Sequence, residues 1–251
     1  LHLLSRRQRQ MCIRDSKNAD FILNGDDDKL STVKTVNGKK PVFFGLDAKN
    51  DFYAKNIKNS GDGKVLATLC FDNNDIDVEI PAIGTYMVTN ALAAAAAGKL
   101  LGLTDEEIAN GVASYKTVGS RANVIDTGKI KIIDDCYNAN PTSVRASLDT
   151  LSNLDGRKVA ILGDMKELGS EELKLHFDTG VYAKSKDIGT VITVGELAKE
   201  LAKGADGKAF DTIEDAKSEI LKTIKSGDVV LVKASHSMQF ENIVEFLKQN
   251  F

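Results

Sequence analysis

The residues with the clearest chemical potential stand in the stretch "DDCYNANPTSVRASL", which starts at Asp134 directly after the apolar run "KIKII". A proline at the first position of a helix lacks the donor that would be left unpaired there, so Asn140 before Pro141 suits an N-cap. Capping does not account for Asp134, Asp135 and Asn138. A carboxylate at such a turn can accept charge-assisted hydrogen bonds from both hydroxyls of a ribose. Two interpretations stay open here, a nucleotide site and a well-capped structural loop.

Two other apolar runs also end in polar residues, in "VAILGDMKELG" and "VLVKASHSMQF". In the first, Gly163 permits a tight exit from a strand, and a plain strand-to-helix turn is the favoured interpretation. In the second, Lys233 and Ser237 can hold a carboxylate or phosphate, although Ser237 suits the N-cap of the last helix better. His176 is expected to be a half-buried helix histidine rather than a catalytic base.

Polar residues in the first half of the chain carry weaker signals. Asn24 begins "LNGDDDKL", an acidic stretch that most resembles a solvated turn. Asn90 lies in the Ala-rich stretch "TNALAAAAAGKLLGL", where it can face a purine or the edge of a core. The sequence contains neither G-x-x-x-x-G-K-[ST] nor G-x-G-x-x-G, so its own motifs offer no cradle for a triphosphate.

Composition narrows the classes of protein. The 251 residues are 42% hydrophobic and 27% charged, as in ordinary globular proteins, and the net charge of −3 gives no case for nucleic acid binding. No run of 18 apolar residues suggests a membrane span. Three cysteines without a close pair favour a reducing compartment, the cytoplasm, and no Cys/His spacing resembles a zinc site.

Residues 1–16 differ from the rest in their basic residues. They hold four arginines and no lysine, whereas the remainder holds every lysine and only three arginines. The run "MCIRDS" also resembles a translated sequencing-adapter tail. We therefore predict that residues 1–16 are a non-native tail. The alternative is a basic arm for nucleic acid or membrane; a signal peptide fits less well, because no apolar stretch follows the charges.

The segment up to residue 118 alternates short strands with helices. "DFILN", "PVFFGL", "KVLATLCF" and "DIDVEI" are expected to be strands, the last two joined by a hairpin turn at Asn73-Asn74. An Ala/Leu-rich helix is predicted over residues 84–102. Thr104 followed by Glu107 predicts a capping box at the start of the next helix.

The second half repeats strand and helix more regularly. The strands "KIKIIDD", "KVAILGD", "GTVITVG" and "DVVLVKAS" precede helices at 141–153, at 170–185, around "ELAKELA" and at "FENIVEFLKQ". Near-continuous apolar strands indicate an α/β fold, a parallel sheet covered on both faces. We place a boundary near 117–120, with part of an α/β domain over 17–118 and a complete Rossmann-like domain over 119–251. Ligands of such sheets bind beyond the carboxyl ends of the strands.

Taken together, these stretches resemble the Mur ligases, the ATP-dependent amide ligases of peptidoglycan synthesis. The resemblance rests on "IIDDCYNANPTSVRASL", "VAILGDMKELG", "VLVKASHSMQFENIVEFL" and "NALAAAAAGKLLGL", with "GSRANVI" and "LNGDDDKL" in support. It implies that residues 17–118 are the C-terminal part of the P-loop-type ATP-binding domain. It further implies that residues 119–251 are the C-terminal domain, which contacts acceptor and ADP.

Within this family the stretch "YNANP" resembles the member that uses D-alanyl-D-alanine as acceptor and UDP-N-acetylmuramoyl-tripeptide as the other substrate. That reaction passes through an acyl phosphate and uses ATP and Mg²⁺. The resemblance implies a monomer in the cytoplasm that serves cell wall synthesis, and through it cell shape, division and the cell cycle. It implies neither nucleic acid binding nor membrane insertion.

The resemblance also assigns residues, although no catalytic residue and no metal ligand in this chain. It places six at the nucleotide: Asp135, Arg121, Asn138, Asn90, Asn24 and Tyr137. Asp135 would meet the ribose, Arg121 the ribose and phosphates, and the asparagines the adenine. It places three at the acceptor: Asn140, Ser237 and Lys233.

The chain departs from the family in several ways. The phosphate loop, the carbamylated lysine, the magnesium ligands and the UDP-binding domain lie upstream of Asn18 in the family. We therefore expect an N-terminally truncated fragment that is inactive alone. Met87 removes one expected polar contact to the base, Ser120 is an insertion that can shift Arg121, and His236 stands where an arginine is commoner.

Two alternatives to this ligase remain. One is a related Mur or folylpolyglutamate-type ligase with another acceptor, against which "YNANP" argues. The other is a non-catalytic module that keeps the Rossmann-like domain for nucleotide binding.

Overall fold

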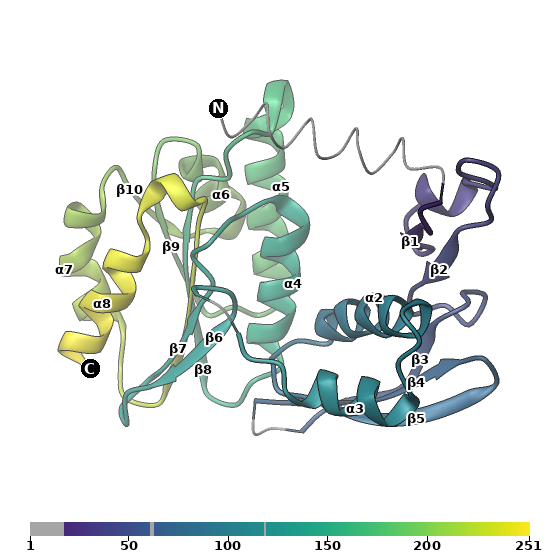
Figure 1. Cartoon of the computed structure of the whole chain (residues 1–251). Helices are drawn as coiled ribbons and strands as arrows, with labels where there is room; N and C mark the ends of the chain where they lie inside the picture. Colours follow the sequence, from purple (N-terminus) through teal and green to yellow (C-terminus); the bar gives the residue numbers. More distant parts are fainter. Residues whose placement is uncertain (1–17, 61–62, 118) are drawn as a thin grey trace. The chain divides into compact units, whose positions relative to one another are not determined.

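The computed structural model describes residues 18–60, 63–117 and 119–251 (Figure 1). The tail expected at residues 1–16 lies outside them. The chain divides into two compact units that interleave along the sequence. The first unit contains residues up to Lys58, Leu66–Ile80 and Met87–Ser114, and the second contains Asn59–Val65, Pro81–Tyr86 and Tyr115–Phe251.

The first unit combines a parallel strand pair, a three-stranded sheet and two α-helices. The strand pair is β1 (Ile22–Asn24) with β2 (Val42–Phe44). The sheet has the order β3-β4-β5, with β3 (Tyr53–Asn59), β4 (Val65–Phe71) and β5 (Asn74–Ile80). The helices are η1 (Leu30–Thr32), α2 (Tyr86–Leu100) and α3 (Asp105–Ala113). Strand β3 was not predicted, because the polar stretch "YAKNIKN" lacks an apolar run.

Two local predictions in this unit can be compared with the structure. Thr104 and Glu107 form the predicted capping box at the start of α3. The predicted position of the hairpin turn is wrong by one residue. Asp72 and Asn73 form the turn with φ of 51° and 62°, and Asn74 already begins β5. Two successive left-handed residues suit the right-handed twist of a two-residue hairpin.

The second unit is a six-stranded sheet with helices on both faces. The strand order is β10-β9-β8-β11-β7-β6, with β6 antiparallel to β7 and the other pairs parallel. The strands are β6 (Asn123–Asp126), β7 (Lys131–Asp134), β8 (Arg157–Gly163), β9 (Thr190–Val194), β10 (Lys208–Phe210) and β11 (Asp228–Lys233). The helices are α4 (Pro141–Ser152), η2 (Gly169–Glu171), α5 (Glu172–Ser185), α6 (Ala198–Ala205), α7 (Ile213–Thr223), η3 (His236–Met238) and α8 (Glu241–Asn250).

This arrangement confirms the predicted α/β fold and doubly covered core, but the sheet is mixed rather than parallel throughout, because β6 is antiparallel to β7. One apolar cluster joins the sheet to α7 and α8, and a second joins its other face to α4, α5 and α6 (Figure 1). All six residues of β11 are buried, as expected for a central strand covered on both sides. The two short edge strands β6 and β10, and the helix α7, were not predicted.

The strand order decides which loops become neighbours. Strand β11 lies between β7 and β8, although it is the last strand of the chain. Its exit leads to α8 on one face, whereas β7 and β8 lead to α4 and α5 on the other. Neighbouring strands whose connections leave to opposite faces form a topological switch point, where α/β sheets bind ligands.

Candidate functional site

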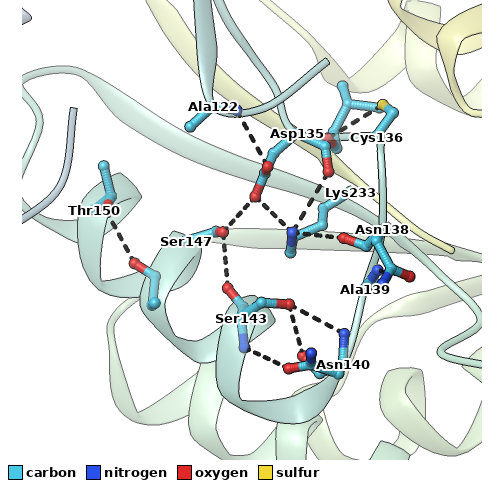
Figure 2. Close-up of polar contacts among 12 residues, drawn as sticks. Ala122, Asp135, Cys136, Asn138, Ala139, Asn140, Ser143, Ser147, Thr150 and Lys233 are labelled. Atoms are coloured by element: carbon cyan, nitrogen blue, oxygen red, sulfur yellow. Dashed lines mark hydrogen bonds and ion pairs between the residues drawn. The ribbon is translucent and has the colours of Figure 1, made fainter. Parts of the chain in front are cut away.

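The end of β11 contributes a buried lysine to this edge of the sheet. The side chain of Lys233 is only 3% exposed, and its Nζ lies 2.6 Å from Asp135 Oδ2. The same ammonium donates to the carbonyl of Asn138 at 2.9 Å and approaches the carbonyl of Asp135 at 3.5 Å (Figure 2). An ammonium group has three donors, so Lys233 is fully paired within the protein. Its burial is tolerated because each donor has an acceptor.

The carboxylate of Asp135 is the centre of this network. Its Oδ2 accepts from Lys233 and, at 2.7 Å, from the hydroxyl of Ser147 on α4. Its Oδ1 accepts from the backbone N–H of Ala122 at 3.1 Å (Figure 2). A carboxylate has about four acceptor positions, and the one Ser147 hydroxyl hydrogen is also within reach of Ser143 O at 2.9 Å, so Asp135 keeps acceptor capacity for a ligand. Its contact with the ribose hydroxyls stays a prediction.

The two asparagines of the turn have different local roles. Asn140 is the N-cap of α4, with Oδ1 accepting from Ser143 N at 2.8 Å and the Ser143 hydroxyl accepting from Asn140 N at 3.1 Å. The predicted cap is thus confirmed, with Pro141 next to it. Asn138 Oδ1 accepts from Ala139 N at 2.8 Å. Among the described residues, none accepts from either side-chain amide nitrogen, so both keep donors for a ligand.

An exposed cation–aromatic stack lies beside the buried pair. The guanidinium of Arg121 lies 3.8 Å from the ring centroid of Tyr137, which is 48% exposed. Tyr137 N donates to the carbonyl of Ser120 at 3.0 Å, so the inserted serine joins the two loops by its backbone. The His236 ring is 5.8 Å from that of Tyr137. Within the described part of the chain, Arg121 has no side-chain hydrogen bond or ion pair, which leaves its N–H groups available.

The structure corrects the expectation for Ser237. We favoured it as the N-cap of the last helix, but it lies inside η3, and α8 begins only at Glu241. The left-handed Gln239 (φ 53°) ends η3, and the fully buried Phe240 fixes where α8 starts. The exposed hydroxyl of Ser237 is therefore not used in a cap.

The strand end after β8 is structural, as predicted. Asp164 is buried, with Oδ1 accepting from Ala198 N at 2.8 Å and Oδ2 paired with Lys166 at 2.7 Å. The reason for Gly163 differs from the expectation of a tight exit. A Cβ there would lie 2.5 Å from Phe240 Cζ and 2.7 Å from Ala234 Cβ, so close packing requires the glycine.

His176 is fully buried, not half-buried as predicted. Its Nε2 accepts from Met165 N at 2.8 Å, and its Nδ1 lies 2.6 Å from the carbonyl of Glu172. Accepting at one nitrogen and donating at the other requires the neutral ring with its proton on Nδ1. The histidine therefore fixes the loop after β8 and is no catalytic base in this arrangement.

Asn24 and Asn90 belong to the first unit, whereas the other predicted site residues belong to the second. Asn24 Oδ1 accepts from Asp26 N at 3.0 Å. The Asp26 carboxylate accepts from Asn50 Nδ2 at 2.9 Å, so this acidic turn is bonded to the next loop rather than merely solvated. Asn90 is exposed on α2, with Nδ2 3.5 Å from Met87 Sδ. Their adenine contacts stay predictions.

Two weakly acidic groups near the site are held neutral. Burial, followed by the charge of Asp134, raises the pKa of the Cys136 thiol. Burial, followed by the charge of Asp135, raises the pKa of the Tyr86 phenol. Neither is an activated nucleophile, because the reactive form of each is the anion. The geometry of this edge therefore suits binding and orientation of a polar ligand.

The described residues contain neither a metal-binding cluster nor a membrane-spanning helix. No cluster of three or more His, Cys, Asp or Glu side chains there is arranged to hold a metal ion. No helix in this part of the chain is long and apolar enough to cross a bilayer.

Comparisons with known proteins agree with this architecture. Residues 9–98 match the Mur ligase middle domain, and residues 120–236 match the Mur ligase, glutamate ligase domain. The first match includes residues 9–16 of the segment that we set aside as a tail.

Curated relatives and solved structures match nearly the whole chain. The UDP-N-acetylmuramoyl-tripeptide–D-alanyl-D-alanine ligase of Bacillus subtilis strain 168 is 33% identical over 238 residues, or 90% of this chain and 50% of that protein. MurF from Acinetobacter baumannii superposes with a TM-score of 0.83 at 28% identity, over 91% of this chain and 51% of that one. MurF from Thermotoga maritima, in complex with ADP, gives a TM-score of 0.82 at 27% identity, over 94% and 54%.

The chain spans about half the length of the curated relatives it matches. The two domain matches follow each other in the order that the sequence motifs predicted, and the solved neighbours share the folds of both units. This chain belongs to the Mur ligase family.

Proposed function

We propose that this chain supplies the middle and C-terminal domains of an ATP-dependent ligase that adds D-alanyl-D-alanine to UDP-N-acetylmuramoyl-tripeptide. The observation that carries the proposal is the match over 90% of the chain to a Bacillus subtilis enzyme of that name. The turn "DDCYNANP", from Asp134 to Pro141, supports it, because its donors and acceptors gather at the topological switch point of the sheet.

In this proposal, ATP transfers its γ-phosphoryl group to a carboxylate of the tripeptide, which gives an acyl phosphate and ADP. The amine of the dipeptide then attacks the acyl carbon, so that an amide bond forms, inorganic phosphate leaves and the amine loses a proton. The described residues bind and orient. The Arg121 guanidinium offers free N–H donors to phosphate oxygens, and Asp135 offers its remaining acceptor capacity to the ribose hydroxyls. In the second unit, the Asn138 amide is assigned to the adenine. For the first unit, taken by itself, Asn24 and Asn90 are proposed as adenine contacts. The Thermotoga maritima neighbour, solved with ADP, supports nucleotide binding.

The acceptor dipeptide is assigned to the exposed rim of the second unit. The side-chain amide of Asn140 and the hydroxyl of Ser237 are available there, and a dipeptide carboxylate accepts from both types of donor. Lys233 was also predicted at the acceptor. Because its three donors are already paired, we now assign Lys233 a supporting role below the surface, without direct contact to the acceptor.

The finer biological setting is also part of the proposal. A monomer in the cytoplasm, where ATP and nucleotide-linked precursors meet, would serve cell wall synthesis, cell shape, cell division and the cell cycle. The two described cysteines, Cys70 and Cys136, are unpaired and buried, which suits a reducing compartment. Magnesium is expected in the reaction, with its ligands elsewhere in the enzyme.

A domain exchange tests the proposal. Residues 18–251 would replace the corresponding half of the Bacillus subtilis relative, and the chimera would be assayed with ATP, Mg²⁺, the UDP-linked tripeptide and a panel of acceptors. We expect product with D-alanyl-D-alanine and none with single amino acids. Turnover with a different acceptor would instead identify another Mur-type ligase.

The 251-residue chain itself provides a second measurement. We expect no ATP hydrolysis when it is mixed with all substrates, because its sequence contains no phosphate-loop motif. Equilibrium dialysis with ADP separates the remaining alternative. Millimolar or no binding is expected for part of a ligase, whereas tight binding would favour a non-catalytic nucleotide-binding module.

A further inference from the structure

We propose that Lys233 is a positioning residue whose buried ammonium holds Arg121 as a receptor for the phosphate groups of a nucleoside diphosphate. The inference rests on the proposed nucleotide binding and adds to it a residue that touches no ligand. Lys233 acts through two chains of contacts, one that leads to the backbone beside Arg121 and one that leads to the ring beneath it.

The first chain of contacts runs through the carboxylate of Asp135. Lys233 Nζ holds Oδ2 at 2.6 Å, and Oδ1 accepts from Ala122 N at 3.1 Å. Ala122 follows Arg121 directly and has a left-handed backbone with φ of 52°. Such a conformation is unfavourable for alanine and persists only where neighbouring contacts enforce it. The carboxylate supplies that contact, and Lys233 fixes the carboxylate.

The second chain of contacts runs through the turn that carries Tyr137. Lys233 donates to the carbonyl of Asn138 at 2.9 Å and approaches the carbonyl of Asp135 at 3.5 Å. It therefore contacts the backbone of the turn on both sides of Tyr137. Tyr137 N in turn donates to Ser120 O at 3.0 Å. The ring is thereby held 3.8 Å from the guanidinium of Arg121.

The stack holds the guanidinium of Arg121 in an orientation that suits binding of an anion. Its face is covered by the ring, while the N–H groups at its edge have no partner among the described residues. A guanidinium presents its donors in a planar fork that matches two oxygens of a phosphate. Fixing that plane in advance lowers the entropy lost on binding. Lys233 cannot take the anion itself, since it is 3% exposed and fully paired.

The experiment compares two ligands that differ only in the phosphates. ADP and adenosine would be titrated to tens of millimolar into the 251-residue chain and followed by NMR. We expect the unsubstituted chain to bind ADP more tightly than adenosine. Lys233→Met should weaken ADP binding about tenfold, the scale of a lost charge-assisted hydrogen bond. Adenosine should lose less affinity, because it has the ribose that meets Asp135 but no phosphate for Arg121.

Substitutions at the exposed ring serve as matched variants. Tyr137→Ala removes the ring beneath the guanidinium and should weaken ADP binding about fivefold, whereas Tyr137→Phe keeps the ring and should lose less ADP affinity than Tyr137→Ala. Because Tyr137 is largely exposed, these variants test the stack even if Lys233→Met fails to fold.

A double substitution separates positioning from general stability. If Lys233 acts through Arg121, the double variant Arg121→Met with Lys233→Met should lose less ADP affinity than the sum of the two single losses. Four results would each overturn the inference. They are additive losses of ADP affinity in the double variant, equal losses for ADP and adenosine, unchanged ADP binding in Tyr137→Ala, and no ADP binding by the unsubstituted chain. The acceptor panel of the chimera is a separate measurement, so failure of the receptor and failure of the proposed ligase are distinguishable.

Discussion

Two strand ends at the same edge of the sheet carry an aspartate paired with a lysine, yet they bury opposite partners. After β8, Asp164 is 3% exposed and its partner Lys166 is 44% exposed. After β7, Asp135 is 14% exposed and Lys233 only 3%. The difference shows that a polar residue after an apolar strand does not by itself mark a ligand site. What matters is which partner the surrounding chain has already satisfied.

The consequences for function differ in the same way. Asp164 holds the start of α6, and His176 holds the backbone beside it, so the β8 end is a structural joint. Asp135 supports a loop that carries exposed and unpaired groups, namely the Arg121 guanidinium and the Asn138 amide. The first strand end holds the fold together, and the second presents donors to solvent.

The largest expected effect contrasts the two lysines. Lys233→Met leaves a nearly buried carboxylate without its counter-ion and should lower the free energy of unfolding by about 3–5 kcal/mol. Lys166→Met also removes the counter-ion of a buried carboxylate, but it breaks one contact where Lys233→Met breaks three, and should cost about 1–3 kcal/mol. Urea unfolding followed by circular dichroism measures both. Equal losses would show that the two strand ends are energetically alike, contrary to our comparison.

A smaller effect tests the packing at the β8 end. Gly163→Ala places a methyl group against Phe240 and Ala234, and overpacking of this kind should cost about 1–3 kcal/mol. Gly111→Ala on the exposed face of α3 is the matched control, because an added Cβ there meets nothing within 4 Å. The control should stabilise the protein by up to about 1 kcal/mol. If Gly163→Ala left the free energy of unfolding unchanged, the packing at the β8 end would have room for a methyl group.

The smallest expected effect tests burial at the β7 end through pH. The pKa of the Cys136 thiol is raised above its ordinary value of 9.0 by burial and by Asp134. Above about pH 9 the unfolded chain loses this proton and the folded chain keeps it, so stability should fall as pH rises. The slope is at most about 1.4 kcal/mol per pH unit.

Cys136→Ala should remove that share of the slope between pH 9 and 10.5, measured as the difference in unfolding free energy from the unsubstituted chain. Cys70→Ala in the first unit is a useful reference, because burial also raises the pKa of that thiol and its own share can be subtracted. An identical slope in Cys136→Ala would indicate that the thiol at the β7 end is open to water.

Local signals in the sequence predicted local structure well. The start of α4 at Asn140-Pro141 and the capping box at Thr104 follow from hydrogen bonds within four residues, so no distant partner is needed. The apolar runs of β7, β8, β9 and β11 likewise predicted parallel strands. The three-residue β10 and the four-residue β6 were missed, because such short edge strands carry too few apolar positions to show a pattern.

The sequence by itself determined the strands that carry apolar runs, where two helices begin, and that polar groups cluster beyond the strand ends, because chain neighbours decide these features. Only the tertiary structure decided that Lys233 lies behind the surface while Arg121 lies on it. Lysine side chains are usually exposed, and burial of this one became possible only when β11 paired between β7 and β8. That pairing brought the acceptors on Asp135 and Asn138, 98 and 95 residues away in the chain, within reach of its ammonium.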